Sequence, residues 1–427
     1  MSKIDYTTAE EAVKLINSGD RIFLHTAAAT PQHLVQALGN RKSELNDVKI
    51  VGAHTEGPLP FFDPKYPNAF DVSAFFVGSN LRPFVNQGLA HYIPIFLQEI
   101  PHLFRSQTMK INVAMVTVSP PNSKGFCTLG VSVDISNAAI DTADIIIAQV
   151  NPSMPKIIGN GIIHIDKIDA KVWVDEPIYE HILPVPNDVD QKIGEHIAGI
   201  IDDGACLQLG IGSIPNAVLG NLGNHKNLGI HTEMFSDGIL PLVESGVING
   251  SQKITDPGKI VSGFVLGSRN IYEFIDDNPL VNMRDSGYTN DTRIIRQNPK
   301  MTAINSAIEV DIFGQVCADS IGHRQYSGVG GQMDFIRGAA LADQGKPIIA
   351  LPSVTKNGIS KIVSQLKPGA SVVTTRAHIH YLVTEYGVAN LYGKNLKQRT
   401  KEIINIAHPN HREQLEKEAF SIFKGKK

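Results

Sequence analysis

The tripeptide His231-Thr232-Glu233 follows a short apolar run and offers a carboxylate that could serve as a nucleophile. A glutamate with an ordinary pKa of about 4.3 is ionised at neutral pH, so it needs no neighbouring base to attack an acyl group. No Ser–His or Cys–His signature stands out near it, and the chain holds no His-Glu-x-x-His motif. Because an isolated glutamate is more often a solvated surface charge, the elements around Glu233 must decide between the two interpretations.

Two glycine-rich segments suggest a second kind of chemistry, the binding of anions by backbone amides. The loop Gly210-Ile211-Gly212-Ser213-Ile214 precedes Pro215, which favours a helix start, and glycines let amides approach a ligand there. The segment 327–335 contains Gly330 and Gly331, whose amides are candidates for an oxyanion hole, a role that needs no side chain. Taken alone, each segment is equally compatible with a tight turn or a flexible loop.

Strand and helix patterns alternate along the chain, which predicts an α/β fold. Short apolar runs rich in Val and Ile are typical of buried parallel strands, and they lie at 111–118, 143–150, 260–266, 348–351 and 371–375. The segment 398–423, broken at Pro409, is predicted to be helical. Ligands of open α/β sheets bind beside the carboxyl ends of the strands, so we expect Glu233 and the loop 210–214 at such an edge.

An internal repeat indicates a duplicated α/β unit. The segment from Gly19 to Asn40 aligns with the segment from Gly204 to Asn224, and in both a proline stands eight residues before the closing glycine. Each copy is followed by a strand that ends in His-Thr-Glu. We therefore predict two related open α/β domains.

The domain boundary is expected near residue 187, after a segment in which prolines at 177, 184 and 186 discourage regular structure. Residues 1–187 would form the N-terminal domain, and residues 188–427 the C-terminal domain with the glutamate and the glycine loops. Glu56, in the first copy, is the internal alternative to Glu233. Glu233 is preferred because only the second copy keeps the glycines of its loop.

Four segments together closely resemble the acetyl-CoA hydrolase/transferase family, and within it the 4-hydroxybutyrate and butyryl-CoA:acetate CoA-transferases. They are 210–218 (GIGSIPNAV), 229–238 (GIHTEMFSDG), 305–311 (NSAIEVD) and 328–339 (GVGGQMDFIRGA). The resemblance extends over nearly the whole chain and implies a class I CoA-transferase-like fold. It also implies that Glu233 carries the intermediate.

The resemblance further implies coenzyme A as a substrate, exchanged between a short-chain acyl-CoA and a carboxylate. The acids implied are 4-hydroxybutyrate or butyrate, with acetate or acetyl-CoA, and the implied assembly is a homodimer. The CoA-binding positions implied are Gly210, Ile211, Gly212, Ser213, Ile214, Asn290, Ile308, Gly331 and Lys356.

Composition argues against several other classes of protein. A formal net charge of −3 leaves no basic face for nucleic acid, and the only notable basic cluster is at 424–427. The three scattered cysteines predict neither disulfides nor a zinc site, and His378 and His380 are expected on one face of a strand rather than on a metal. No run approaches the ~20 apolar residues of a membrane span, and the polar start predicts a cytoplasmic protein.

Two other functions are compatible with the same residues. An acyl-CoA hydrolase would use the same fold and intermediate, with water as the final acceptor. A non-catalytic sensor of CoA or a sugar phosphate would keep the binding loops without turnover, since related open α/β folds bind such ligands.

Overall fold

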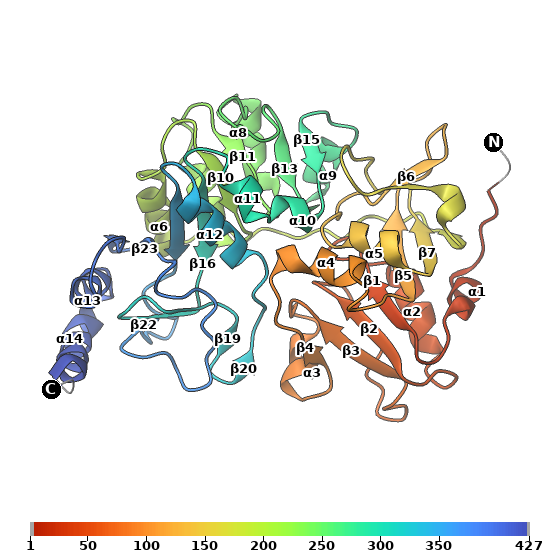
Figure 1. The fold of residues 1–427 in the computed structure, drawn as a ribbon, viewed down its shortest axis with the longest axis horizontal. Helices are drawn as coiled ribbons and strands as arrows, with labels where there is room; N and C mark the ends of the chain where they lie inside the picture. Colours follow the sequence, from red (N-terminus) through yellow and green to blue (C-terminus); the bar gives the residue numbers. More distant parts are fainter. Residues whose placement is uncertain (1–3, 425–427) are drawn as a thin grey trace. The chain divides into compact units, whose positions relative to one another are not determined.

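The computed structural model describes residues 4–424, which form two compact units (Figure 1). One unit comprises Met1–Ile182 with Val261–Asn290, and the other comprises Leu183–Ile260 with Asp291–Lys427. The segment Val261–Asn290 thus packs with the first unit, whereas a single boundary near residue 187 would assign it to the second. The domain boundary itself stays a prediction, and the basic cluster at 424–427 lies, apart from Lys424, outside the described residues.

The first unit is built on a seven-stranded parallel sheet with the order β4-β3-β2-β1-β5-β7-β9. Its strands are β1 (Arg21–Leu24), β2 (Val48–Gly52), β3 (Phe70–Ala74), β4 (His91–Tyr92), β5 (Val113–Val118), β7 (Ile145–Val150) and β9 (Ala170–Trp173). Smaller strands are β6 (Phe126–Thr128), β8 (Ile162–His164), β13 (Ile260–Ser262), β14 (Phe264–Val265) and β15 (Val281–Met283). The helices are α1 (Ala9–Ala12), α2 (Gln32–Asn40), α3 (Arg82–Asn86), α4 (Ile100–Arg105), α5 (Ser136–Thr142), α9 (Arg269–Ile275) and α10 (Ser286–Thr289).

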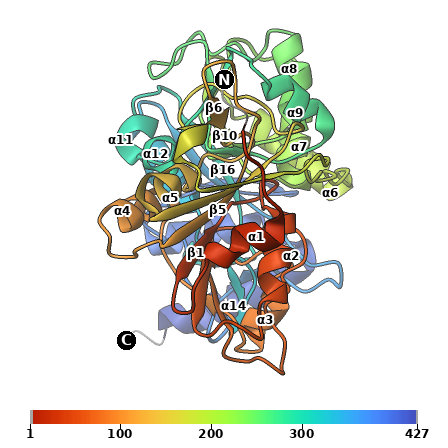
Figure 2. The same ribbon diagram turned by 90° about the vertical axis from the view of Figure 1, so that its right-hand side faces the viewer.

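Side chains of β1 alternate between the two faces of this sheet, as the pleat of a strand requires. Ile22 and Leu24 pack in one apolar cluster with Leu34 and Leu38 of α2. Figure 2 shows α1 and α2 side by side on this side of the unit. Phe23 packs instead edge-on against Phe104 of α4, with ring centroids 5.9 Å apart. The sheet is therefore covered on both faces, which explains why its strands are so apolar.

The second unit is built on a six-stranded sheet with the order β11-β10-β16-β21-β23-β24, parallel except for the last pair. Its strands are β10 (Cys206–Leu209), β11 (Gly229–Ile230), β16 (Thr302–Ser306), β21 (Lys346–Ala350), β23 (Tyr381–Thr384) and β24 (Gly387–Asn390). Smaller strands are β12 (Met234–Phe235), β17 (Glu309–Asp311), β18 (Val316–Cys317), β19 (Ser320–Ile321), β20 (Arg324–Gln325) and β22 (Ile362–Val363). The helices are α6 (Asp188–Ala198), α7 (Ser213–Gly220), α8 (Leu240–Glu244), α11 (Thr292–Ile295), α12 (Gln332–Leu341), α13 (Leu396–Asn405) and α14 (Pro409–Lys424).

The two sheets share a common core topology. In the first, β2-β1-β5-β7-β9 are neighbours, and in the second β11-β10-β16-β21-β23 follow the same order. The unit β1–α2–β2 thus corresponds to β10–α7–β11, as the repeat in the sequence predicted. The predicted fold class, α/β with two open domains, is confirmed.

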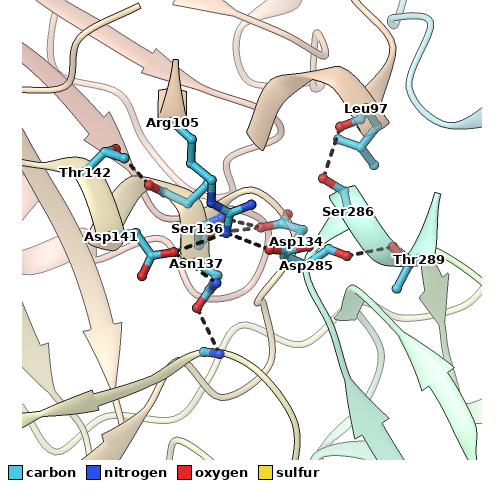
Figure 3. Close-up of polar contacts among 12 residues, drawn as sticks. Leu97, Arg105, Asp134, Ser136, Asn137, Asp141, Thr142, Asp285, Ser286 and Thr289 are labelled. Atoms are coloured by element: carbon cyan, nitrogen blue, oxygen red, sulfur yellow. Dashed lines mark hydrogen bonds and ion pairs between the residues drawn. The ribbon is translucent and has the colours of Figure 1, made fainter. Parts of the chain in front are cut away.

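Polar contacts fasten the segment Val261–Asn290 to the first unit (Figure 3). Arg105 Nη2, at the end of α4, lies 2.7 Å from Asp285 Oδ2, and Ser286 Oγ donates to the carbonyl of Leu97 at 3.0 Å. The amide of Ser286 donates to the carbonyl of Asp134 at 2.9 Å. A four-residue helix such as α10 has little stability of its own, so these contacts hold it in place.

Two predictions of local structure were wrong, and a third was right in part. The run 371–375 is not a strand: within it only Thr374 forms a bridge, to Val316, and the run is an irregular segment. The run 260–266 divides into two short strands, β13 and β14. His378 and His380 lie in a turn and an irregular stretch rather than on one strand. The two helices predicted around Pro409 are confirmed as α13 and α14.

Two findings bear on metals and membranes. Between residues 4 and 424, no three His, Cys, Asp or Glu side chains gather in a way that would suit a metal ion. Over the same residues, no helix combines the length and apolar character needed to cross a bilayer.

Candidate active site

The loop between β10 and α7 forms one side of the candidate site in the second unit. The strand β10 is buried along its whole length, and the chain turns away from it at Gly210. Gly212 has a φ of +133°, which L side chains rarely adopt, and it directly precedes α7, so a glycine is needed there. A Cβ at Gly210 would meet no protein atom within 4 Å, so the space beside this residue is open. The helix begins at Ser213 rather than at Pro215, two residues earlier than predicted.

Glu233 follows β11 and lies beside this loop. The amide of His231 donates to the carbonyl of Leu207 at 3.0 Å, and Thr232 Oγ1 donates to the carbonyl of Leu209 at 3.2 Å. Thr232 Oγ1 also lies 2.9 Å from the carbonyl of Met234, which fixes the turn that contains the half-buried Glu233. A small cavity lined by residues that include Gly210 and Thr232 joins the loop to this turn. The structure therefore brings the predicted nucleophile and the predicted glycine loop to one edge of one sheet.

The other predicted positions of this unit follow neighbouring parallel strands. Ile308 comes two residues after β16 and donates its amide to the carbonyl of Cys317 at 2.9 Å. Lys356 is exposed in a loop after β21, closed by a hydrogen bond from the amide of Thr355 to the carbonyl of Ile359. Because the carboxyl ends of parallel strands meet at the same edge, both segments leave the sheet on the side of Glu233.

Gly330 and Gly331 immediately precede α12. Gly330 has a φ of +55°, and Gly331 stands at the N-cap of this ten-residue helix. Phe335, one turn into α12, packs near His231 with ring centroids 6.3 Å apart, so the first turn of α12 lies near the turn that carries Glu233. The first amides of a helix have no acceptor within it, which suits them to an anion.

Asn290, another predicted position, lies in the first unit. It ends α10 in the first unit, is fully buried, and accepts a hydrogen bond on Oδ1 from Thr289 Oγ1 at 2.8 Å. Its expected contact with CoA stays a prediction.

Glu56, the internal alternative, belongs to a polar cluster in the first unit. His54 Nε2 lies 3.0 Å from Glu56 Oε1, and the Glu56 side chain is 12% exposed. Burial acts to raise the pKa of Glu56, but hydrogen bonds from His54 and Tyr179 and the nearby His181 leave the pKa below its usual range. Burial and the Glu56 carboxylate in turn raise the pKa of Tyr179. This carboxylate is thus already engaged as an acceptor.

Sequence reasoning missed two features near these glutamates. Tyr179 and His181 lie in the proline-rich stretch that was interpreted only as a connection. Lys253, in a polar segment, is 5% exposed and hydrogen-bonded to the strand that leads to Glu233. Nothing in the sequence distinguishes Lys253 from a solvated surface lysine.

Two open α/β units, with a carboxylate and a glycine loop at one sheet edge of the second unit, are the architecture that the family resemblance implied. Residues 3–184 match the acetyl-CoA hydrolase/transferase N-terminal domain, and residues 267–419 match the acetyl-CoA hydrolase/transferase C-terminal domain. The chain belongs to the acetyl-CoA hydrolase/transferase family, as the resemblance indicated.

Two relatives and one solved structure show how similar the chain is to members of this family. The chain is 49% identical to a succinyl-CoA:acetate/propanoyl-CoA:succinate CoA transferase of Fasciola hepatica, over 98% of this chain and 88% of the relative. It is 45% identical to the 4-hydroxybutyrate coenzyme A transferase of Clostridium kluyveri, over 96% of this chain and 95% of the relative. The crystal structure of 4-hydroxybutyrate CoA-transferase from Porphyromonas gingivalis superposes with a TM-score of 0.82 at 36% identity, covering 97% of each chain. These relatives support the expected class of enzyme, a CoA transferase.

Proposed function

We propose that this protein exchanges CoA between a short-chain acyl-CoA and a carboxylate, by a ping-pong mechanism through a glutamyl-CoA thioester on Glu233. The observation that carries the proposal is the bond between Thr232 and the carbonyl of Leu209, because it holds Glu233 beside the loop at Gly210. A carboxylate next to amides that suit an anion is what attack on a thioester requires.

The reaction begins when a Glu233 carboxylate oxygen attacks the thioester carbonyl of the acyl-CoA. The C–S bond breaks, and an acyl-glutamyl anhydride and CoA thiolate result. The thiolate then attacks the glutamyl carbonyl of the anhydride, which releases the first acid as a carboxylate and leaves CoA as a thioester on Glu233. A second carboxylate reverses these steps and departs as its own CoA ester. Both intermediates are activated acyl groups, so the energy of the thioester is conserved.

The amides at Gly330, Gly331 and the first turn of α12 are our candidates for the donors to the oxyanion that forms in each attack. The positive φ of Gly330 allows the chain to turn into α12, whose first amides have no acceptor within the helix. Loss of one such donor typically costs about 100- to 1000-fold in rate.

The competing nucleophile, Glu56, is less suited to the reaction. Its carboxylate accepts hydrogen bonds from His54 and Tyr179, and these bonds lower its basicity. We assign the covalent role to Glu233 because only the second copy of the repeat keeps the glycines of its loop, and because the family resemblance points to this position.

The acids proposed are short and unbranched: 4-hydroxybutyrate or butyrate, with acetate or acetyl-CoA as the partner. The relative at 49% identity, which is named for succinyl-CoA, acetate and propanoyl-CoA, adds succinate and propionate to the acids to be tested. A hydrophobic pocket discriminates only about 10- to 200-fold per methylene, so several of these acids are expected to react at measurable rates.

Two alternatives make different predictions. An acyl-CoA hydrolase would release CoA without an added carboxylate, whereas a transferase depends on one. A non-catalytic sensor would bind CoA equally well in the wild type and in Glu233→Gln, with no turnover in either.

The decisive test is the intact mass of the protein after incubation with acetyl-CoA, followed by borohydride reduction and peptide mapping. A CoA adduct whose reduction maps to Glu233 is expected, and Glu56→Gln serves as the matched control that should still form it. Turnover without any adduct would contradict the covalent mechanism.

We also propose a cellular location and an oligomeric state for the protein. A cytoplasmic location is supported by three buried cysteines that form no disulfide, since thiols stay reduced there. A homodimer rests on the family resemblance, and analytical ultracentrifugation would test it.

A further inference from the structure

The strand that leads to Glu233 is short and lies at the edge of its sheet. β11 has two residues and pairs only with β10 within the sheet of the second unit, with Cys206 opposite Gly229 and Leu207 opposite Ile230. Alternate residues of a parallel strand direct their backbone groups to opposite sides. The amides of Gly229 and His231 bond to β10, so the carbonyl of Ile230 points to the outer side.

Lys253 donates a hydrogen bond to that outward-facing carbonyl. Its Nζ donates to the carbonyl of Ile230 at 2.8 Å and to the carbonyl of Lys259 at 2.6 Å. Burial lowers the pKa of Lys253, whereas Cys206 and Asp256 act in the opposite direction. Burying an ammonium group is costly unless its hydrogen bonds are made, so the position of the Lys253 side chain is tightly specified.

The lysine stem also packs directly on β11. A Cβ at Gly229 would lie 2.7 Å from Cγ of Lys253, so the glycine is what lets the stem lie against the strand. The segment that presents Lys253 is itself anchored, because the buried Asn298 accepts hydrogen bonds on Oδ1 from the amides of Ile254 and Thr255, at 3.1 and 3.2 Å.

In the first unit a regular strand pairs along the corresponding outer side. There β2, the counterpart of β11, pairs on its outer side with β3, with Ile50 opposite Val72. In the second unit, the segment 247–250 bridges to Leu228 just before β11, and the ammonium group of Lys253 bonds to the next outward carbonyl, that of Ile230.

We propose that Lys253 is a positioning residue for Glu233: it holds β11 from its outer side and so fixes the turn 231–233 that carries the nucleophile. The proposal rests on the function proposed above. Lys253 acts through the backbone of Ile230, three residues before Glu233, and has no direct part in the chemistry.

The test compares Lys253→Met with Lys346→Met. Lys346 Nζ also donates to a backbone carbonyl in the second unit, that of Ile200 at 2.7 Å, but from the opposite end of a strand, so it is the matched control. For each variant we would measure the melting temperature, the KM for acetyl-CoA, and the single-turnover rate of CoA adduct formation on Glu233 by rapid quench and mass spectrometry.

A misplaced nucleophile loses rate more than affinity, so Lys253→Met should slow adduct formation roughly 10- to 100-fold, with KM changed less than about threefold. Lys346→Met should lower the melting temperature and leave the rate of adduct formation within about twofold of the wild type. Lys253→Arg should recover part of the rate. If Lys253→Met does not fold, Gly229→Ala, which pushes the lysine stem away, should give the same loss of rate.

A wild-type adduct rate in folded Lys253→Met or Gly229→Ala, or an equal loss in Lys346→Met, would overturn the inference while leaving the proposed function intact. A wild-type protein that forms no adduct on Glu233 would overturn both.

Discussion

Arg105 and Asp285 stand 180 residues apart in the chain, and their side chains meet at 2.7 Å in the first unit. Asp285 is largely buried, and Arg105 is partly exposed and also reaches Asp141 at 3.1 Å. Burial acts to lower the pKa of Arg105, and its two aspartates overcome that effect and raise the pKa. This pair fastens the start of α10, and with it the segment that returns to the first unit.

We expect Arg105→Met to destabilise the protein by about 1–3 kcal/mol, because it leaves the Asp285 carboxylate buried without its cation. Urea unfolding followed by tryptophan fluorescence and circular dichroism would measure this. The control is Arg269→Met, which breaks an exposed pair with Glu273 and should cost less than about 1 kcal/mol. Equal losses in the two variants would contradict the role given to Asp285.

Glu233→Gln should reduce transfer by at least roughly a thousandfold, because an amide cannot form the anhydride. Steady-state exchange of CoA between acetyl-CoA and butyrate would measure the loss. Glu56→Gln is the matched change at the equivalent position of the first unit, and it should retain adduct formation. A Glu56→Gln enzyme without the adduct, beside a Glu233→Gln enzyme that keeps it, would reverse the assignment.

Gly210→Ala tests whether the open space beside the first loop residue belongs to CoA. A methyl group there meets no protein atom within 4 Å, so we expect an unchanged melting temperature. If CoA occupies the space, the KM for acetyl-CoA should rise by roughly tenfold or more. An unchanged KM would remove Gly210 from the binding site.

The buried thiols should not react in the folded protein. Burial raises the pKa of Cys206 to about 11 and that of Cys127 to about 12, so neither forms a thiolate at pH 8. Incubation with dithionitrobenzoate should therefore leave these cysteines unmodified until urea is added. Because both pKa values are raised, the stability that the protonated thiols contribute is complete below pH ~8.5 and is lost as the pH rises toward 11 and 12. Rapid labelling of either thiol at pH 8 would contradict the raised pKa values of these cysteines.

Acid should weaken the first unit through Glu56. The folded pKa of Glu56 lies below its usual value, so its contribution to stability is present above about pH 4.3 and is lost as the pH falls through the folded pKa. The melting temperatures of the wild type and Glu56→Gln should therefore converge as the pH is lowered from 6 to 3. A difference in melting temperature that stays constant from pH 6 to pH 3 would contradict the lowered pKa of Glu56.

Local patterns in the sequence predicted much of the fold. The glycine and proline spacing located the loop before α7, and the duplicated His-Thr-Glu located both glutamates at the ends of β2 and β11. The prediction of a strand at 371–375 was wrong because these residues form an irregular segment, in which Thr374 makes a single bridge to Val316. A short apolar run does not distinguish a buried strand from a buried irregular segment.

The features that escaped prediction depend on contacts between distant residues. Lys253 appears solvated in the sequence, but it is buried beside β11 in a segment that Asn298 anchors. The return of Val261–Asn290 to the first unit likewise depends on contacts such as that of Arg105 with Asp285. Local periodicity carries no information about either.

The brevity of β11 has a consequence for how copies of this protein behave at high concentration. An open sheet edge is a template on which the strand of another chain can add, and long flat edges promote aggregation. Here β11 is two residues long, the residue before it is already bridged to Ile248, and the outward carbonyl of Ile230 is bonded to a lysine. The same ammonium group should thus protect the sheet from a foreign strand, and Lys253→Met should aggregate faster than the wild type when both are partly unfolded.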